Sequence, residues 1–180
     1  LVTGLVGMTI TGDIFNLYVF LEISSIAAYT LIASARKPRS YVASFNYLVL
    51  GSIAGGFILI GIWNLYAATG TLNMLDLARL LPASFELATV HAGFLFLVIG
   101  FSIKAAFFPL HLWLPDAYTE SPSAVTVLLS TVMSKVSVYA LIRIIFTIFT
   151  TTYIIDVFPV TGFILFIATV AMIAGAVLAI

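Results

Sequence analysis

The chain of 180 residues contains no cysteine and very few charged residues. Without cysteine it can form no iron–sulfur cluster, thiolate metal site or disulfide. Its seven basic and seven acidic residues give zero net charge, so there is no electrostatic basis for binding nucleic acid. Charged residues make up 8% of the chain, against roughly 25% in a soluble domain. We therefore expect no cofactor, no metal ion and no nucleic-acid partner.

Long apolar runs dominate instead, because 63% of the residues are hydrophobic. A membrane-spanning helix needs ~20 apolar residues, whereas a barrel strand needs only ~9–11. The runs therefore predict an all-α, polytopic membrane protein of about five to six transmembrane helices. The predicted spans are residues 1–11 (a partial helix), 14–34, 41–68, 88–108, 123–149 and 158–180.

Short polar segments mark the ends of these spans. Thr11, Gly12 and Asp13 predict a turn with Asp13 as a helix N-cap, and Pro38 is expected to end a helix. Residues 69–87 predict a connector with a short interfacial helix, and residues 150–157 a loop. In span 41–68, Gly51 and Gly55 have a spacing that lets helices approach closely, which indicates packing and no more.

One basic cluster indicates the orientation of the chain. Arg36, Lys37 and Arg39 place loop 35–40 in the cytoplasm by the positive-inside rule, in a plasma (cell) membrane. Both ends of the sequence lie inside apolar runs. We therefore expect the chain to be a piece of a longer protein.

Three ionisable residues lie near the centres of spans: Glu22, Lys104 and Lys135. A charge in hydrocarbon costs at least ~2.5–3.5 kcal/mol on insertion scales, so such residues are functional candidates by default. Polar residues lie at helical spacing around Glu22 and around Lys135, whereas the helical neighbours of Lys104 are apolar. A Glu–Lys pair in a membrane can couple movement to proton transfer, because burial and pairing act oppositely on both groups.

Proline breaks the chain soon after Lys104. Pro109 removes a backbone donor and clashes with the carbonyl of Ala105, which predicts a broken helix at membrane depth. Such breaks occur where backbone lines a cavity, and they recur at the ion sites of transporters. His111 follows the break, and an imidazole is suited to a proton relay.

Each of these residues also has a structural interpretation. Lys104 and Lys135 could extend to an interface, Glu22 could serve only as a hydrogen-bond partner, and His111 could cap the broken helix. His91 is expected at the membrane interface. Trp63 and Trp113 fit the aromatic belts of a membrane protein.

Two blocks of sequence resemble a known family. Residues 104–143, KAAFFPLHLWLPDAYTESPSAVTVLLSTVMSKVSVYALIR, match a pattern of Lys, P-x-H-x-W-L-P-D-A and a second Lys. Residues 12–33, GDIFNLYVFLEISSIAAYTLIA, match a second pattern with its glutamate at Glu22. The blocks resemble the antiporter-like subunits of respiratory complex I, of Mrp cation/proton antiporters and of membrane-bound hydrogenases.

The resemblance implies a fourteen-helix fold built from two inverted five-helix repeats. Residues 1–155 would be the first repeat with its first helix truncated, and residues 156–180 the first helix of the second. It also implies that Glu22 and Lys104 form the switch pair, with Lys135 as the next relay station and His111 between or beside them. The second repeat's broken helix, which supplies the outward half-channel, would lie beyond these residues.

We therefore predict an ion-translocating membrane subunit that relays protons through Glu22, Lys104, His111 and Lys135, with or without exchange for Na⁺. Its expected partners are other membrane subunits of a large complex, a peripheral redox arm and the lipid bilayer; the chain itself does no redox chemistry. Two alternatives remain open. One is a structural membrane module whose buried pair only holds helices together, and the other is a substrate-binding secondary transporter.

Overall fold

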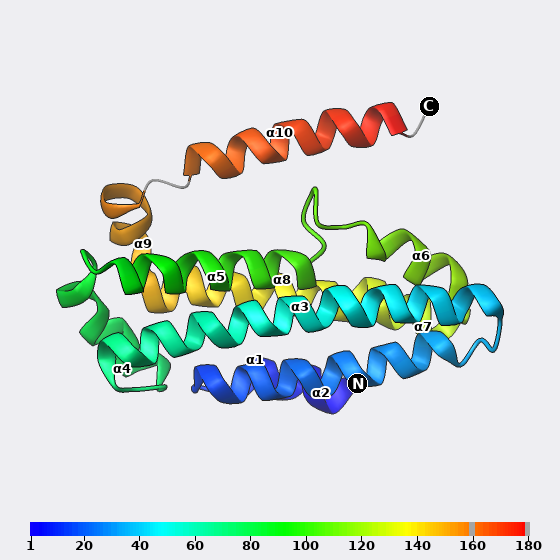
Figure 1. Cartoon of the computed structure of the whole chain (residues 1–180), viewed down its shortest axis with the longest axis horizontal. Helices are drawn as coiled ribbons and strands as arrows, with labels where there is room; N and C mark the ends of the chain where they lie inside the picture. The colour runs from blue at the N-terminus through cyan, green and yellow to red at the C-terminus, as the bar shows by residue number, and fades with distance from the viewer. Residues whose placement is uncertain (159–160, 179–180) are drawn as a thin grey trace.

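The computed structural model describes residues 1–158 and 161–178, and within them every regular element is helical, which confirms the all-α prediction. Figure 1 shows the elements in chain order. The α-helices are α1 (Val2–Ile10), α2 (Ile14–Ala33), α3 (Pro38–Thr69), α4 (Met74–Leu80), α5 (Ala88–Lys104), α6 (Trp113–Glu120), α7 (Ser123–Leu128), α8 (Ser134–Arg143), α9 (Thr150–Thr152) and α10 (Thr161–Leu178). A 3₁₀ turn, η1 (Leu81–Ser84), follows α4.

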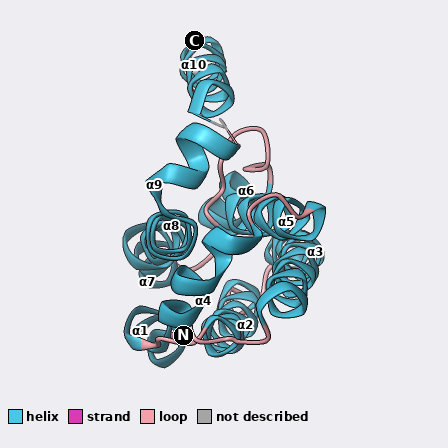
Figure 2. Ribbon diagram, turned by 90° about the vertical axis from the view of Figure 1, so that its left-hand side faces the viewer, coloured by secondary structure: helices cyan, strands magenta, loops and turns pink. Residues whose placement is uncertain are grey.

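The long helices run side by side, and their shared core positions the candidate site. Figure 2 looks along them: α1, α2, α3 and α5 surround the core together with the α7–α8 segment, while α10 is set apart. The closest packing joins α5 to α3 and α3 to α2. Two neighbours of α3 are therefore the helices that carry Glu22 and Lys104.

The turn predicted at residues 11–13 is confirmed. The carboxylate of Asp13 accepts a hydrogen bond of 2.8 Å from the backbone N–H of Asn16, so Asp13 is the N-cap of α2. Asn73 caps α4 in the same way, accepting from the N–H groups of Leu75 and Asp76. The short helix expected within residues 69–87 is therefore α4.

The prediction that Pro38 ends a helix is wrong. The preceding helix, α2, has already ended at Ala33, and Pro38 is the first residue of α3. A proline is favourable at this position because its missing N–H would have no partner in the first turn of a helix.

The predicted break after Lys104 is confirmed, but it begins earlier than expected. We predicted a span to residue 108, whereas α5 ends at Lys104 and Ala106 has a left-handed φ of 56°. Helical structure resumes at Trp113 in α6. Lys104 therefore occupies the last turn of the broken helix.

The loop predicted at residues 150–157 is wrong. Helical turns run from Ser123 to Val157 and include three π-helical segments, η2 (Leu129–Met133), η3 (Ile144–Phe149) and η4 (Tyr153–Val157). Thr150, with a φ of 64°, is the one irregular residue in the second half of this segment. Phe149 and Tyr153 are fully buried against the core, so tertiary packing keeps this polar stretch helical.

Three helical segments of the described chain are long and apolar enough to cross a membrane: Ile14–Ala33, Pro38–Thr69 and Ser123–Val157. Two shorter apolar helices, Ala88–Lys104 and Ile164–Val177, accompany them. The loop between α2 and α3 lies at the right-hand end of Figure 1 with the α6–α7 turn, and α4 lies at the opposite end with α9. The division between repeats at residue 155 stays a prediction, and residues 159–160 and 179–180 of the last span lie outside the described residues.

Candidate functional site

Lys104 and Glu22 meet across the helix interface, as the resemblance implied. The side chain of Lys104 is only 1% exposed and that of Glu22 is 25% exposed, with 3.5 Å between Nζ and Oε1. This distance makes an ion pair, but it is longer than the 2.7–3.2 Å typical of a hydrogen bond. The pair is therefore loose, although its lysine is fully enclosed.

The nearest partner of Lys104 is Ser25, one turn beyond Glu22 on α2. Lys104 Nζ donates a hydrogen bond of 2.7 Å to Ser25 Oγ and lies 3.5 Å from the hydroxyl of Tyr29. Ser25 in turn donates its own proton to the backbone carbonyl of Leu21, so its oxygen faces Lys104 as an acceptor. The neighbours of Lys104 on its own helix are apolar. Its surroundings are nevertheless polar, because α2 supplies the hydrogen-bond partners.

A stack of two aromatic rings packs against the C-terminal end of α5, where the helix is broken. The indole of Trp113 is 3% exposed, lies parallel to the ring of Tyr47 at 3.9 Å, and donates a hydrogen bond of 3.0 Å to the carbonyl of Ile103. Tyr47 also meets the ring of Tyr29 edge-on at 4.7 Å. The prediction that Trp113 belongs to an interfacial belt is therefore wrong: it packs inside the protein and ties α6 to the residue before Lys104.

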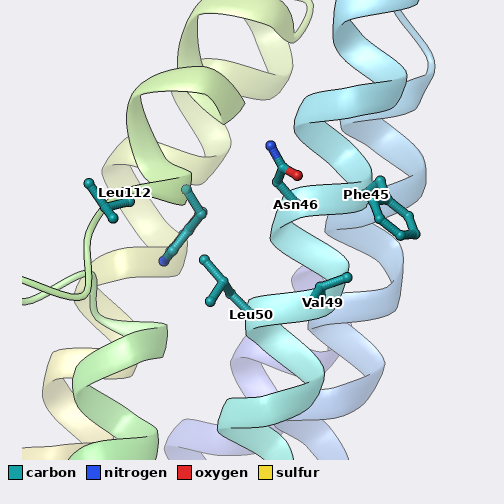
Figure 3. Close-up of a pocket in the computed structure, with 6 residues that line it drawn as sticks. Phe45, Asn46, Val49, Leu50 and Leu112 are labelled. Atoms are coloured by element: carbon teal, nitrogen blue, oxygen red, sulfur yellow. The ribbon is translucent and has the colours of Figure 1, made fainter.

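A shallow cavity of about 250 Å³ opens beside this stack (Figure 3). In the figure, Asn46 and Leu50 on α3 lie on the side of that helix toward Leu112 at the start of α6, while Phe45 and Val49 point to its other side. Trp113 contributes to the lining as well. Neither Glu22 nor Lys104 is among the residues around this cavity.

His111 lies in the break but does not join the pair. Its Nδ1 is buried and has no hydrogen-bond partner among the described residues, and its ring lies 5.5 Å from that of Phe108. The N-cap residue of α6 is Leu112, and no side-chain capping hydrogen bond is formed at that position. The proposed relay role of His111 stays a prediction.

Lys135 lies on the first turn of α8, and its side chain is exposed. Nζ donates a hydrogen bond of 2.7 Å to the carbonyl of Ser130 on its own helical segment. Within the described residues, no hydrogen bond or ion pair joins Lys135 to Lys104 or to His111. The pair predicted at Glu22 and Lys104 is thus assembled in the fold, whereas the further stations are separate.

The other end of α5 carries a titratable contact that the sequence did not reveal. His91 Nδ1 lies 2.7 Å from the hydroxyl of Tyr153, which comes from η4 and is fully buried. Aromatic rings surround the two groups: Phe85, Phe94, Phe149 and Phe158. Whether His91 lies at the membrane interface stays a prediction.

Sequence patterns missed the roles of Ser25, Tyr47 and Trp113. In the sequence, Ser25 was only one of the polar residues at helical spacing around Glu22. One signal could have linked it to Lys104: an ammonium whose own helical neighbours are all apolar must find its acceptors on another helix. No comparable signal marks the stacking of Tyr47 on Trp113, because the two residues lie far apart in the sequence.

Comparison with protein families gives one clear match. The family described as "NADH:quinone oxidoreductase/Mrp antiporter, TM" matches residues 11–180. The chain is 54% identical over 143 residues to an NADH-quinone oxidoreductase subunit (type N) of Desulforudis audaxviator, covering 79% of this chain and 28% of that protein. It is 36% identical over 149 residues to a Na(+)/H(+) antiporter subunit (type D) of Bacillus subtilis, covering 83% and 30%.

Solved structures with this fold belong to large membrane complexes. A chain of the membrane-bound sulfane sulfur reductase, an archaeal respiratory membrane complex, superposes with a TM-score of 0.78 at 40% identity and covers 83% of this chain and 31% of that one. A chain of the Mrp complex from Dietzia sp. superposes with a TM-score of 0.73 at 35% identity, covering 81% and 28%. The chain therefore spans less than a third of the relatives it matches.

Proposed function

The chain belongs to the NADH:quinone oxidoreductase/Mrp antiporter transmembrane family, and from this premise we propose that it forms part of an ion-translocating membrane subunit. Relatives named as NADH-quinone oxidoreductase and Na(+)/H(+) antiporter subunits support this proposal, as do neighbours that are subunits of large membrane complexes. The transported ion is H⁺, with or without exchange for Na⁺.

The observation that carries the proposal is the ion pair itself. A lysine side chain that is 1% exposed lies 3.5 Å from a carboxylate oxygen, at the end of a broken helix. A charge held in this way is costly unless it is paired, and its protonation therefore depends on where its partner lies. Movement of Glu22 toward or away from Lys104 would favour proton uptake or proton release at Nζ.

Each titratable group has a role in this scheme. Lys104 is the switch, which holds or releases a proton, and Glu22 is the partner whose distance decides between the two. Lys135 and His111 are later stations, which water molecules would have to connect to Lys104. Lys135 is exposed in the described chain, so water can reach it. Its helix, α8, packs against α5, the helix that carries Lys104.

The setting follows from the same reasoning. We assign the chain to a multi-pass subunit of the plasma membrane, with loop 35–40 in the cytoplasm and other membrane subunits as neighbours. A peripheral redox arm on partner chains would supply energy in a complex of the oxidoreductase type. In a complex of the antiporter type, the counter-ion gradient would do so.

The experiment is to introduce Lys104→Ala and Glu22→Gln separately into the full-length subunit in its native complex. Ion pumping by inverted membrane vesicles is then measured with a pH-sensitive dye, together with the amount of assembled complex. We expect both variants to assemble and to lose most of their pumping. Normal pumping by both would refute the proposal.

A structural role for the pair is the rival explanation, and the double variant Lys104→Met/Glu22→Gln distinguishes it. Replacing a buried ion pair with uncharged groups is often neutral for stability. A module whose pair only holds helices together would therefore stay folded and keep pumping in the double variant. We expect the double variant to assemble and to be inactive.

A further inference from the structure

Two glycines of α3 lie directly against the polar side chains of α2. Gly55 faces the carboxylate of Glu22, and Gly51 faces the hydroxyl of Tyr29. We call these two glycines the α3 notch. The sequence pattern indicated only close helix packing at this spacing, whereas the structure shows which side chains use the space.

At both glycines, a side chain of α2 fills the space that a Cβ atom would take. A Cβ atom at Gly55 would lie 2.6 Å from Oε1 and 3.2 Å from Cδ of Glu22. A Cβ atom at Gly51 would overlap the hydroxyl of Tyr29 and lie 3.0 Å from its Cζ. The carboxylate that pairs with Lys104, and the phenol beside that lysine, therefore fill the volume that an alanine methyl would take.

Other glycines on these helices serve a different purpose. A Cβ atom at Gly61 would meet Leu97 at 2.7 Å and the backbone oxygen of Gly93 at 3.0 Å, so that glycine allows α3 to pack on α5. Gly56, next to the notch, is exposed and has nothing within 4 Å of such an atom. The chain thus offers a packing glycine and an open glycine for comparison with Gly55.

We propose that the α3 notch positions the switch, with Gly55 fixing how far the Glu22 carboxylate lies from Lys104 and Gly51 holding Tyr29 beside it. The proposal rests on the proposed function of the pair and goes beyond it, because it places part of the switch on a helix that carries no charge of its own there. Gly51 and Gly55 are positioning residues, since neither touches a transported ion.

The geometry explains why a glycine is needed at residue 55. Glu22 Oε1 is buried, receives no hydrogen bond among the described residues, and lies 3.5 Å from Nζ. Ser25 holds Nζ more tightly, at 2.7 Å. The carboxylate therefore sits within reach of the ammonium without binding it closely, and a small displacement in either direction changes the strength of the pair.

A methyl group at residue 55 would act on the carboxylate and leave the fold intact. The colliding atom at Gly55 is the far end of a flexible side chain, which can rotate away, so the backbones of α2 and α3 need not separate. At Gly61 one of the colliding atoms is a backbone oxygen of α5, so the helices themselves must move. The two substitutions should therefore fail in different ways.

The test compares Gly55→Ala, Gly56→Ala and Gly61→Ala in the full-length subunit within its native complex. Three quantities are measured: the amount of assembled complex, ion pumping per assembled complex, and the infrared band of the Glu22 carboxyl, assigned by its loss in Glu22→Gln. We expect Gly55→Ala to assemble normally and its Glu22 infrared band to shift. Pumping should be at least about tenfold slower, because misplacing a reacting group by about 1 Å can reduce a rate by this much or more. Gly56→Ala should match the wild type in all three.

Gly61→Ala should lower the amount of assembled complex, because α3 and α5 must move apart to admit the methyl group. A second arm uses Glu22→Asp, whose carboxylate is one methylene shorter and leaves room for the added methyl. The double variant Gly55→Ala/Glu22→Asp should pump faster than either single variant. Such a rescue would not follow from a general loss of packing.

Three results would overturn the inference: normal pumping and an unshifted band in Gly55→Ala, loss of assembly in Gly55→Ala as in Gly61→Ala, or no rescue in the double variant. Failure of the proposed function is seen separately, as normal pumping in both Glu22→Gln and Lys104→Ala. In that case the infrared band still decides whether Gly55 positions the carboxylate.

Discussion

The two ends of α5 hold their titratable groups in opposite ways. At the Lys104 end the helix is broken and the ammonium has three polar neighbours at 2.7 to 3.5 Å, of which the carboxylate is among the farthest. At the His91 end the imidazole has one partner, the hydroxyl of Tyr153 at 2.7 Å, enclosed by aromatic rings. Lys104 has one close partner, Ser25, and two looser ones that it can exchange, whereas His91 has a single close partner in a packed cluster.

The contrast leads to a hypothesis about which end of α5 can change its contacts. Lys104 has three partners over two turns of α2, Glu22, Ser25 and Tyr29, so a shift of α2 relative to α5 would redistribute its contacts without leaving the ammonium unpaired. His91 has no second partner of this kind among the described residues. Under the proposed function, the Lys104 end would be the switch and the His91 end the anchor of the same helix, and the following predictions test that distinction.

The largest effect on stability is expected at Trp113. Replacement by alanine removes a buried indole and its stack on Tyr47, and should lower the free energy of unfolding by about 3–5 kcal/mol. Phenylalanine keeps a ring for stacking but loses the hydrogen bond to Ile103, about 1 kcal/mol, and part of the buried ring volume, so its loss should be smaller than that of alanine. Thermal unfolding of the purified complex would measure both, and equal losses would show that the stack contributes nothing.

A smaller effect is expected at Ser25, where the consequence is more specific. Alanine removes the closest acceptor of a buried ammonium, a loss of about 1.5–3 kcal/mol for a hydrogen bond to a charged group. Lys104 would then turn to Glu22 and bind it more closely, so pumping should fall along with stability. Threonine keeps the hydroxyl and is the matched control. Unchanged pumping in Ser25→Ala would show that Lys104 does not depend on this acceptor.

The smallest effect is expected at the His91 end. Tyr153→Phe removes one hydroxyl from the aromatic cluster and should lower the free energy of unfolding by about 1 kcal/mol, while ion pumping stays at the wild-type rate. Tyr66→Phe, at an exposed tyrosine of α3, is the control and should change neither quantity. A loss of pumping in Tyr153→Phe comparable to that in Ser25→Ala would break the distinction between the two ends.

The sequence predicted the candidate site better than it predicted the helix boundaries around it. Glu22 and Lys104 stood out because a charge in an apolar run needs a partner, and the fold brings the two together. The boundary at residues 150–157 was wrong because its polar side chains indicated a loop, while the burial of Phe149 and Tyr153 keeps it helical. Tertiary contacts outweigh local preference in such segments.

Trp113 shows the same limit at a single residue. A tryptophan beside a run of leucine and proline fits a membrane interface equally well, since its indole has an apolar body and a polar tip. Only the position of Tyr47, on another helix, decides that the ring is buried and that its N–H reaches the end of α5.

The sequence by itself determined the class of protein, the positions of its charges and the proline break, because each follows from local chemistry and from the cost of placing charge in lipid. The tertiary structure alone decided how the charges are held. The distances between Glu22, Ser25 and Lys104 depend on how α2 and α5 pack against α3. The glycines of the α3 notch leave space for the side chains of Glu22 and Tyr29. Packing between helices is a property of their facing surfaces, which no single run of residues contains.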